Sequence, residues 1–97
     1  MVAPDETKSE VISLLKAKFP KSGTSRVDVA DGTDWQGEPS IDIRIVFRRN
    51  PSKDEMRYAR PRLIDELRTW LSKRGDERFP YFSFLTEKDE KELLRQT

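Results

Sequence analysis

The stretch Ser40-Ile41-Asp42-Ile43-Arg44-Ile45-Val46-Phe47-Arg48 decides the fold of this chain. Successive side chains of a β-strand point to opposite faces of the sheet, so this stretch presents two different faces. One face carries large apolar side chains: Ile41, Ile43, Ile45 and Phe47. The other face carries mainly charged side chains: Asp42, Arg44, Val46 and Arg48. We therefore expect a half-buried strand with an apolar face in the core and a charged face at the surface.

The residues before this strand predict a second strand that pairs with it. Arg26–Ala30 alternates between polar and apolar positions, and residues 31–39 are rich in turn-forming residues. Because the two strands are close in sequence, we expect an antiparallel hairpin. Val27 and Val29 are then buried, and Arg26 and Asp28 point outward.

Helical periodicity appears on both sides of the hairpin. Apolar residues recur on one face between Asp5 and Phe19; Thr7 has the spacing of a capping box with Glu10, although Pro4 and Asp5 also suit an earlier start. Downstream, a second capping-box spacing opens a helical segment from residue 53 to residue 74, with Gly75 as its C-terminal cap. Pro61 lacks a backbone donor, so we expect a kink or break near Ala59.

The remaining residues predict a third strand and a short last helix. Residues 79–85 are rich in aromatic side chains, and Pro80 indicates that this strand starts there or lies at a sheet edge. Thr86 suits the N-cap of a helix over residues 87–96. That helix offers only Leu93 and Leu94 to the core, so we expect it to be marginal.

This order of elements predicts a single α+β domain over residues 1–97, with residues 1–4 frayed. The order is helix, strand, strand, kinked helix, strand, helix. It fits a small two-layer sandwich, in which helices pack on one face of a three-stranded sheet. The other face of the sheet would then be open to solvent or to a partner.

Composition excludes several kinds of chemistry. The chain of 97 residues contains no cysteine and no histidine, which excludes disulfides, thiolate or imidazole metal ligands, and histidine-based catalysis. We therefore expect a protein that is not an enzyme, has no catalytic or metal site and needs no cofactor. No stretch is apolar enough to span a membrane, so the cytoplasm is the expected compartment.

Positive charge is concentrated in the middle of the chain. Residues 44–78 carry eleven basic and six acidic side chains, although the net charge of the whole chain is only +1. Arginines beside a tyrosine on an open sheet can bind single-stranded RNA, since arginine contacts phosphate and tyrosine stacks on a base. The candidate residues for this function are Arg26, Arg44, Arg48, Arg49, Arg57 and Tyr81. The simpler interpretation is a solvated face on which Asp28 and Asp42 pair with these arginines.

Aromatic residues offer a different kind of site, a surface that binds a protein. Trp35 lies in a polar loop beside two glycines, and Tyr81 is expected on the open face. Tryptophan and tyrosine are enriched among the residues that dominate protein interfaces. Trp35 also fits a second interpretation, which we prefer from sequence, in which it folds back over the core beneath the hairpin.

Two acidic patterns are weak candidates for metal binding. Residues 37–43 faintly echo a nucleotidyltransferase motif, which needs two carboxylates two positions apart, but Ser40 stands at the first position and leaves Asp42 alone. Acidic residues near the end of the chain lack the alternating spacing of a calcium loop: Glu87, Asp89, Glu90 and Glu92. We interpret them as solvated helix surface.

Two resemblances follow from these motifs. The combination of residues 34–39, the isoleucine strand and residues 78–84 resembles a group of small uncharacterised bacterial proteins with no established activity. The element order resembles that of type II KH-like RNA-binding domains, and this resemblance implies RNA as a ligand. The Gly-x-x-Gly clamp of those domains does not occur between residues 53 and 78.

The sequence favours a protein–protein interaction or regulatory partner module over the alternatives. Its partner would be another protein or a second copy of the chain in a homodimer. The alternative function is RNA binding through a basic open sheet face, and no membrane partner is expected.

Overall fold

The computed structural model describes residues 1–95 and confirms the predicted α+β fold. The elements follow the expected order: α1 (Pro4–Lys18), β1 (Thr24–Thr33), β2 (Pro39–Phe47), a π-helical turn η1 (Glu55–Ala59), α2 (Arg60–Lys73), β3 (Phe79–Thr86) and α3 (Glu87–Arg95). Residue 96, the predicted end of the last helix, lies outside the described residues. The first helix takes the earlier of its two possible starts.

The sheet has the order β1-β2-β3, so the isoleucine strand is central. β1 and β2 form the expected antiparallel hairpin, in which Val29 lies opposite Ile43. β3 runs parallel to β2 and places Phe82 beside Ile43. β3 is an edge strand and Pro80 lies near its start, as predicted, because a proline has no N–H to donate and alternate N–H positions of an edge strand need no partner strand.

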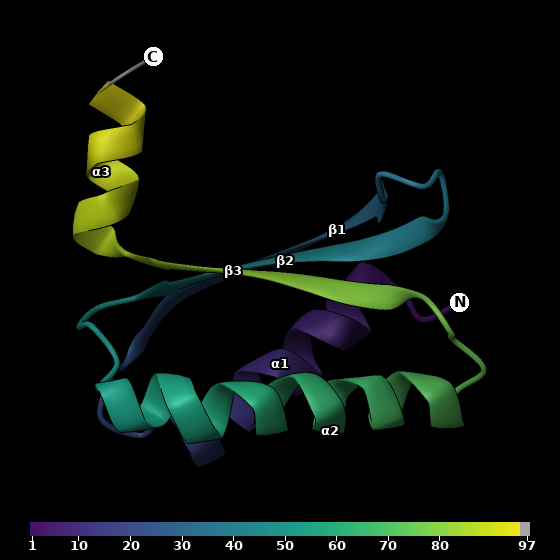
Figure 1. Ribbon diagram of the computed structural model, residues 1–97, viewed down its shortest axis with the longest axis horizontal. Helices are drawn as coiled ribbons and strands as arrows, with labels where there is room; N and C mark the ends of the chain where they lie inside the picture. The colour runs from purple at the N-terminus through teal and green to yellow at the C-terminus, as the bar shows by residue number, and fades with distance from the viewer. Residues whose placement is uncertain (96–97) are drawn as a thin grey trace.

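Helices α1 and α2 lie on one face of the sheet (Figure 1). The hydrophobic core lies between these helices and the sheet. The alternation in β2 holds, since its four odd-numbered apolar side chains from Ile41 to Phe47 are at most 1% exposed. From α2, three leucines one turn apart are fully buried: Leu63, Leu67 and Leu71. Helix α3 instead stands on the opposite side of the sheet, so Leu93 and Leu94 are exposed and do not reach the core (Figure 1).

The irregularity expected near Ala59 is a π-helical turn. The amide of Arg60 donates to the carbonyl of Glu55, five residues earlier, and α2 starts at Arg60. Pro61 lies in the first turn of α2, where its missing N–H is least costly. The wider π turn accommodates the proline ring without ending the helical path, because Ala59 and Arg60 both keep helical backbone angles.

The C-terminal end of α2 positions a buried carboxylate. Gly75 adopts a left-handed φ of 76°, and its amide donates to Ser72 while the amide of Asp76 donates to Leu71. These two bonds form a Schellman motif, which reverses the chain after the helix. The reversal turns the Asp76 side chain into the interior, where it is 0% exposed.

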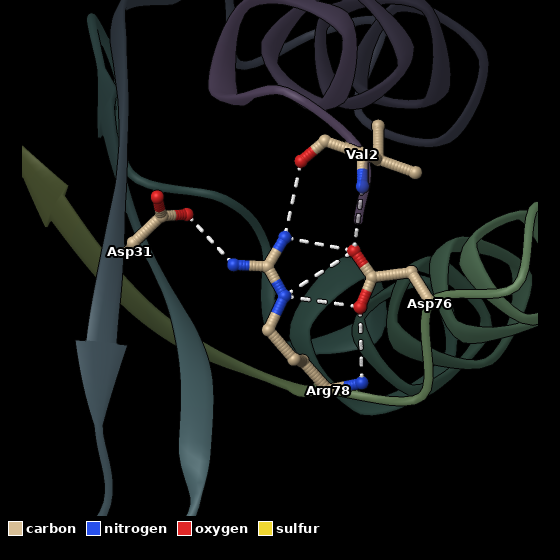
Figure 2. A network of polar contacts seen from close by, with 4 residues as sticks. All are labelled: Val2, Asp31, Asp76 and Arg78. Atoms are coloured by element: carbon tan, nitrogen blue, oxygen red, sulfur yellow. Dashed lines mark hydrogen bonds and ion pairs between the residues drawn. The ribbon is translucent and has the colours of Figure 1, made fainter.

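Asp76 is the centre of a polar cluster that joins distant parts of the chain (Figure 2). Its carboxylate accepts a bond of 2.7 Å from Arg78 Nη2 and one of 3.0 Å from the amide of Val2. The same guanidinium donates to the carbonyl of Val2 at 3.0 Å and to the carboxylate of Asp31 at 2.7 Å. The cluster therefore ties the start of the chain to the α2–β3 connection and to β1.

Two consequences follow from this cluster. The hydrogen bonds from Arg78 hold the pKa of Asp76 well below its usual range, although burial by itself raises that pKa. Val2 is buried and bonded through both its amide and its carbonyl. The sequence predicts a frayed stretch at residues 1–4, which remains a prediction. In the structure Val2 contacts Asp76 and Arg78, 74 and 76 positions away, which no local pattern indicates.

We predict that Asp76→Asn lowers the free energy of unfolding by about 3–5 kcal/mol at neutral pH, because it leaves the Arg78 guanidinium buried without its main counterion. The ionised carboxylate stabilises the folded state above the pKa of the unfolded chain, and this contribution disappears as the pH falls through the lower folded pKa. The difference between the wild type and the variant should thus shrink below about pH 4. Urea unfolding from pH 7 to pH 2 measures it.

The control for this prediction is Asp31→Asn, because the Asp31 side chain is 64% exposed. An exposed ion pair contributes at most about 1 kcal/mol, so this variant should remain close to the wild type. Parallel pH profiles for the wild type and Asp76→Asn would contradict the assigned role of the cluster.

Candidate functional site

The face of the sheet opposite α1 and α2 is the candidate site, and we call it the outer face. Strand register and side-chain alternation assign its residues. They are Arg26, Asp28, Ala30 and Gly32 of β1, Ser40, Asp42, Arg44 and Val46 of β2, and Phe79, Tyr81, Ser83 and Leu85 of β3. No other described element lies over the middle of this face, since α1 and α2 occupy the other side (Figure 1).

Helix α3 bounds one end of the outer face. Arg26 donates to Glu90 of α3 through two guanidinium nitrogens and to Asp28 at 2.9 Å, so this arginine is fully engaged. Val46 points to the outer face but is only 1% exposed, because it lies at this covered end between Arg26 and Leu85. The helix therefore covers the outer face only at the end of the sheet where β3 finishes.

The β1–β2 loop bounds the other end and rises on the same side as α3 (Figure 1). Asp34 accepts bonds of 2.9 Å from the amides of Gln36 and Glu38, which close the loop. Its second oxygen accepts a 3.4 Å bond from the hydroxyl of Tyr81, which places the loop next to the outer face. Trp35 is 85% exposed, so the interpretation that it folds back over the core is wrong.

Between these two ends the outer face contains a hollow of about 370 Å³. Small side chains surround Asp42 on this face, and they are Ala30, Gly32, Ser40 and Ser83. A Cβ atom on Gly32 would lie 2.4 Å from Asp42 Oδ2, so the glycine is what allows the carboxylate to lie across β1. The hollow exists because small residues leave space beside a large ring, that of Tyr81.

Charge on the outer face is mixed and not basic. Arg26 is neutralised by two carboxylates, which leaves Arg44 as the one guanidinium of this face without an ion pair among residues 1–95. Asp42 likewise has no ion pair within the described chain. Burial and the nearby charges of Asp34 and Asp42 raise the pKa of Tyr81, which indicates negative potential around its hydroxyl.

The remaining predicted arginines lie elsewhere. Arg48 and Arg49 follow β2, where their amides donate to Gly23 and Ser22. With two cations of the following segment they form what we call the basic end: Arg48, Arg49, Lys53 and Arg57. All four are exposed, and none forms an ion pair with a carboxylate in the described part of the chain. The structure thus separates the six predicted RNA-binding residues into two surfaces.

Three features of the site were not anticipated from sequence. They are the bond from Arg26 to Glu90, the position of Asp34 beside Tyr81, and the contact of Asp42 with Gly32. The Asp34-x-Gln36-x-Glu38 turn has a local signal, since aspartate commonly accepts backbone bonds at the start of a turn. The contact between Arg26 and Glu90 joins residues 64 positions apart and has no local signal.

Within residues 1–95, no group of three or more aspartate, glutamate, histidine or cysteine side chains is arranged to hold a metal ion. Over the same range, no helix has the length and apolar character needed to cross a membrane.

Comparisons with protein-family models, with curated proteins and with solved structures give no match to this chain.

We predict that Arg26→Gln releases α3 from the sheet while the rest of the fold stays intact. Helix α3 has no buried residue, and an isolated helix of nine residues is unstable in water, so its order depends on local contacts such as the bond to Glu90. Amide hydrogen exchange should become faster in residues 88–95 and stay unchanged in β2. The control is Glu92→Gln, because Glu92 lies on the same helix and forms no ion pair within residues 1–95. Unchanged exchange in α3 would contradict this role of Arg26.

Proposed function

We propose that this chain is a protein–protein interaction module and that its outer face, together with Trp35, is the binding surface. The observation that carries the proposal is an uncovered sheet face with mixed charge beside a tryptophan that is 85% exposed. Exposed tryptophan, tyrosine and arginine side chains are the residue types that most often dominate binding to proteins.

The shape of the outer face supports this proposal. The β1–β2 loop and α3 rise from opposite ends of it, on the same side of the sheet (Figure 1). The hollow of the outer face is lined by residues of all three strands, among them Asp28, Asp42 and Tyr81. Exposed aromatic side chains lie at the loop end, where the rings of Phe79 and Tyr81 are in contact, with centroids 5.0 Å apart and planes tilted by 51°. Aromatic side chains contribute buried area to a protein contact, and charged groups of complementary sign contribute specificity.

The edges of the sheet are less suitable for binding. At the β3 edge, guanidinium groups from α2 lie over two rings, Arg60 over Phe84 and Arg68 over Phe79, each at 4.9 Å. Charged side chains at a sheet edge discourage the addition of another strand. β1 has an irregular register between Thr24 and Arg26, which also disfavours pairing.

We predict that Trp35→Ala abolishes recovery of the partner. A lysate of the native host is passed over three immobilised proteins: the wild type, Trp35→Ala, and a double variant of the basic end. The double variant combines Arg48→Gln with Arg49→Gln. Bound proteins are identified by mass spectrometry, and sedimentation velocity tests self-association. The wild type and the double variant should recover the same partner, or the same dimer, and Trp35→Ala should lose it because a buried interface tryptophan contributes at least about 2 kcal/mol. A monomer that recovers no partner would refute the proposal.

A second candidate function is RNA binding through the basic end. Its support is the set of exposed cations without carboxylate partners in residues 48–57. Tyr81 is a poor stacking platform for this purpose, because Asp34 and Asp42 would repel a phosphate at the same position.

We predict that RNA binding, if it occurs, is lost in the Arg48→Gln, Arg49→Gln double variant and is unaffected by Tyr81→Phe. Fluorescence anisotropy with a mixed-sequence single-stranded RNA at 20 mM and 200 mM salt measures it. Affinity should fall steeply with salt, because phosphate contacts release counterions. The absence of binding at the lower salt concentration would end this candidate.

A further inference from the structure

We propose that the hollow on the outer face receives an arginine side chain of the protein partner, which bonds to Asp42 and stacks on the ring of Tyr81. This inference rests on the proposed function, and it adds the chemistry of the contact.

The first argument is the position of Asp42. The register places Ala30, Asp42 and Tyr81 in one row across the three strands. Within this row the Asp42 carboxylate leans toward Gly32 of β1. Asp42 is exposed and lines the hollow of about 370 Å³. This space accommodates a planar side chain beside the ring and leaves the carboxylate within its reach.

The second argument is the local charge. Two carboxylates, Asp28 and Asp42, and one guanidinium group, Arg44, line the hollow. Asp28 is already paired with Arg26, which also pairs with Glu90. The carboxylate of Asp42 has no counterion among the side chains of residues 1–95. A cation supplied by a partner would complete this pairing, whereas an anion would meet Asp34 and Asp42.

A third, independent observation is a hydroxyl beside the carboxylate. Ser40 is only 1% exposed, and its Oγ atom has no hydrogen-bond partner in the described chain. A Cβ atom on Gly32 would lie 3.1 Å from Ser40 Oγ and 2.4 Å from Asp42 Oδ2, so both oxygens are next to the same backbone position. Buried polar groups are nearly always paired. The Ser40 hydroxyl is thus available to bond to Asp42 when a partner fixes that carboxylate.

The aromatic ring selects arginine over lysine. A guanidinium group is planar, stacks on a tyrosine ring and donates two parallel bonds to one carboxylate. The ammonium group of lysine is a strongly hydrated point charge without this geometry. Arg44, which also lines the hollow, would at the same time donate hydrogen bonds to a partner carboxylate. An extended segment with alternating charge is therefore a suitable occupant.

The proposal is tested by nuclear magnetic resonance with the full chain. The probes are three blocked tripeptides, acetyl-Ala-X-Ala-amide with arginine, lysine or glutamate at X. Titration with the arginine peptide should shift the amide signals of Ala30, Asp42 and Ser83, and the lysine peptide should bind several-fold more weakly. The glutamate peptide should not shift them.

Matched variants assign the contact. Asp42→Asn should weaken the arginine peptide about tenfold, since it removes a charge-assisted hydrogen bond. Asp54→Asn removes an exposed carboxylate at the basic end and should leave binding unchanged. Gly32→Ala displaces the Asp42 carboxylate without removing its charge and should also weaken binding. The spectra themselves report whether each variant is folded.

Several results would overturn the proposal. The first two are equal shifts of the amide signals with the arginine and glutamate peptides, and equal affinity for the arginine and lysine peptides. The other two are binding of the arginine peptide that survives Asp42→Asn, and shifts of the outer-face amide signals by an RNA oligonucleotide. If the arginine peptide fails while Trp35→Ala still loses a recovered partner, the interaction module stands and only the arginine contact is refuted.

Discussion

A buried carboxylate requires a cation beside it, and this requirement joins three separate parts of the molecule. Asp76 is fully buried at the end of α2, and Arg78 both neutralises it and bonds to Val2 and Asp31. Without this pair, the α2–β3 connection would have to place its polar groups in water. The register of β3 beside β2, and with it the row of residues that contains Asp42 and Tyr81, depends on that connection.

Charge pairing also orders the surface of the molecule, at the end of the outer face. Arg26 is divided between Asp28 and Glu90, which holds α3 upright at one end of the sheet. That engagement removes Arg26 from any basic platform. Among residues 1–95, it leaves Asp42 and Arg44 as charges without an ion pair at the centre of the outer face, and this pattern of both signs is what motivates the proposal of a protein partner.

Much of this architecture was predictable because its signals are local. The alternation from Ile41 to Phe47 gave both the strand and its buried face, and the spacing of Ser52 and Glu55 gave a capping box that the structure contains, with both bonds at 3.0 Å. Thr86 caps α3 in the same manner through Asp89. The site was only partly predictable: Tyr81 and Arg44 were assigned to the open face, whereas the role of Asp42 as a free carboxylate depends on what lies beside it.

The sequence by itself determined the order of the elements, the inward and outward faces of β2, and the absence of histidine and cysteine chemistry. Each of these follows from residue type and spacing within a few positions of the chain. Only the tertiary structure decided that Arg26 is engaged by α3, that Trp35 is exposed, and that Val2 is held by Asp76. The physical reason is that a polar contact between residues 64 or 74 positions apart depends on where the packed core brings them, and no local pattern encodes that meeting.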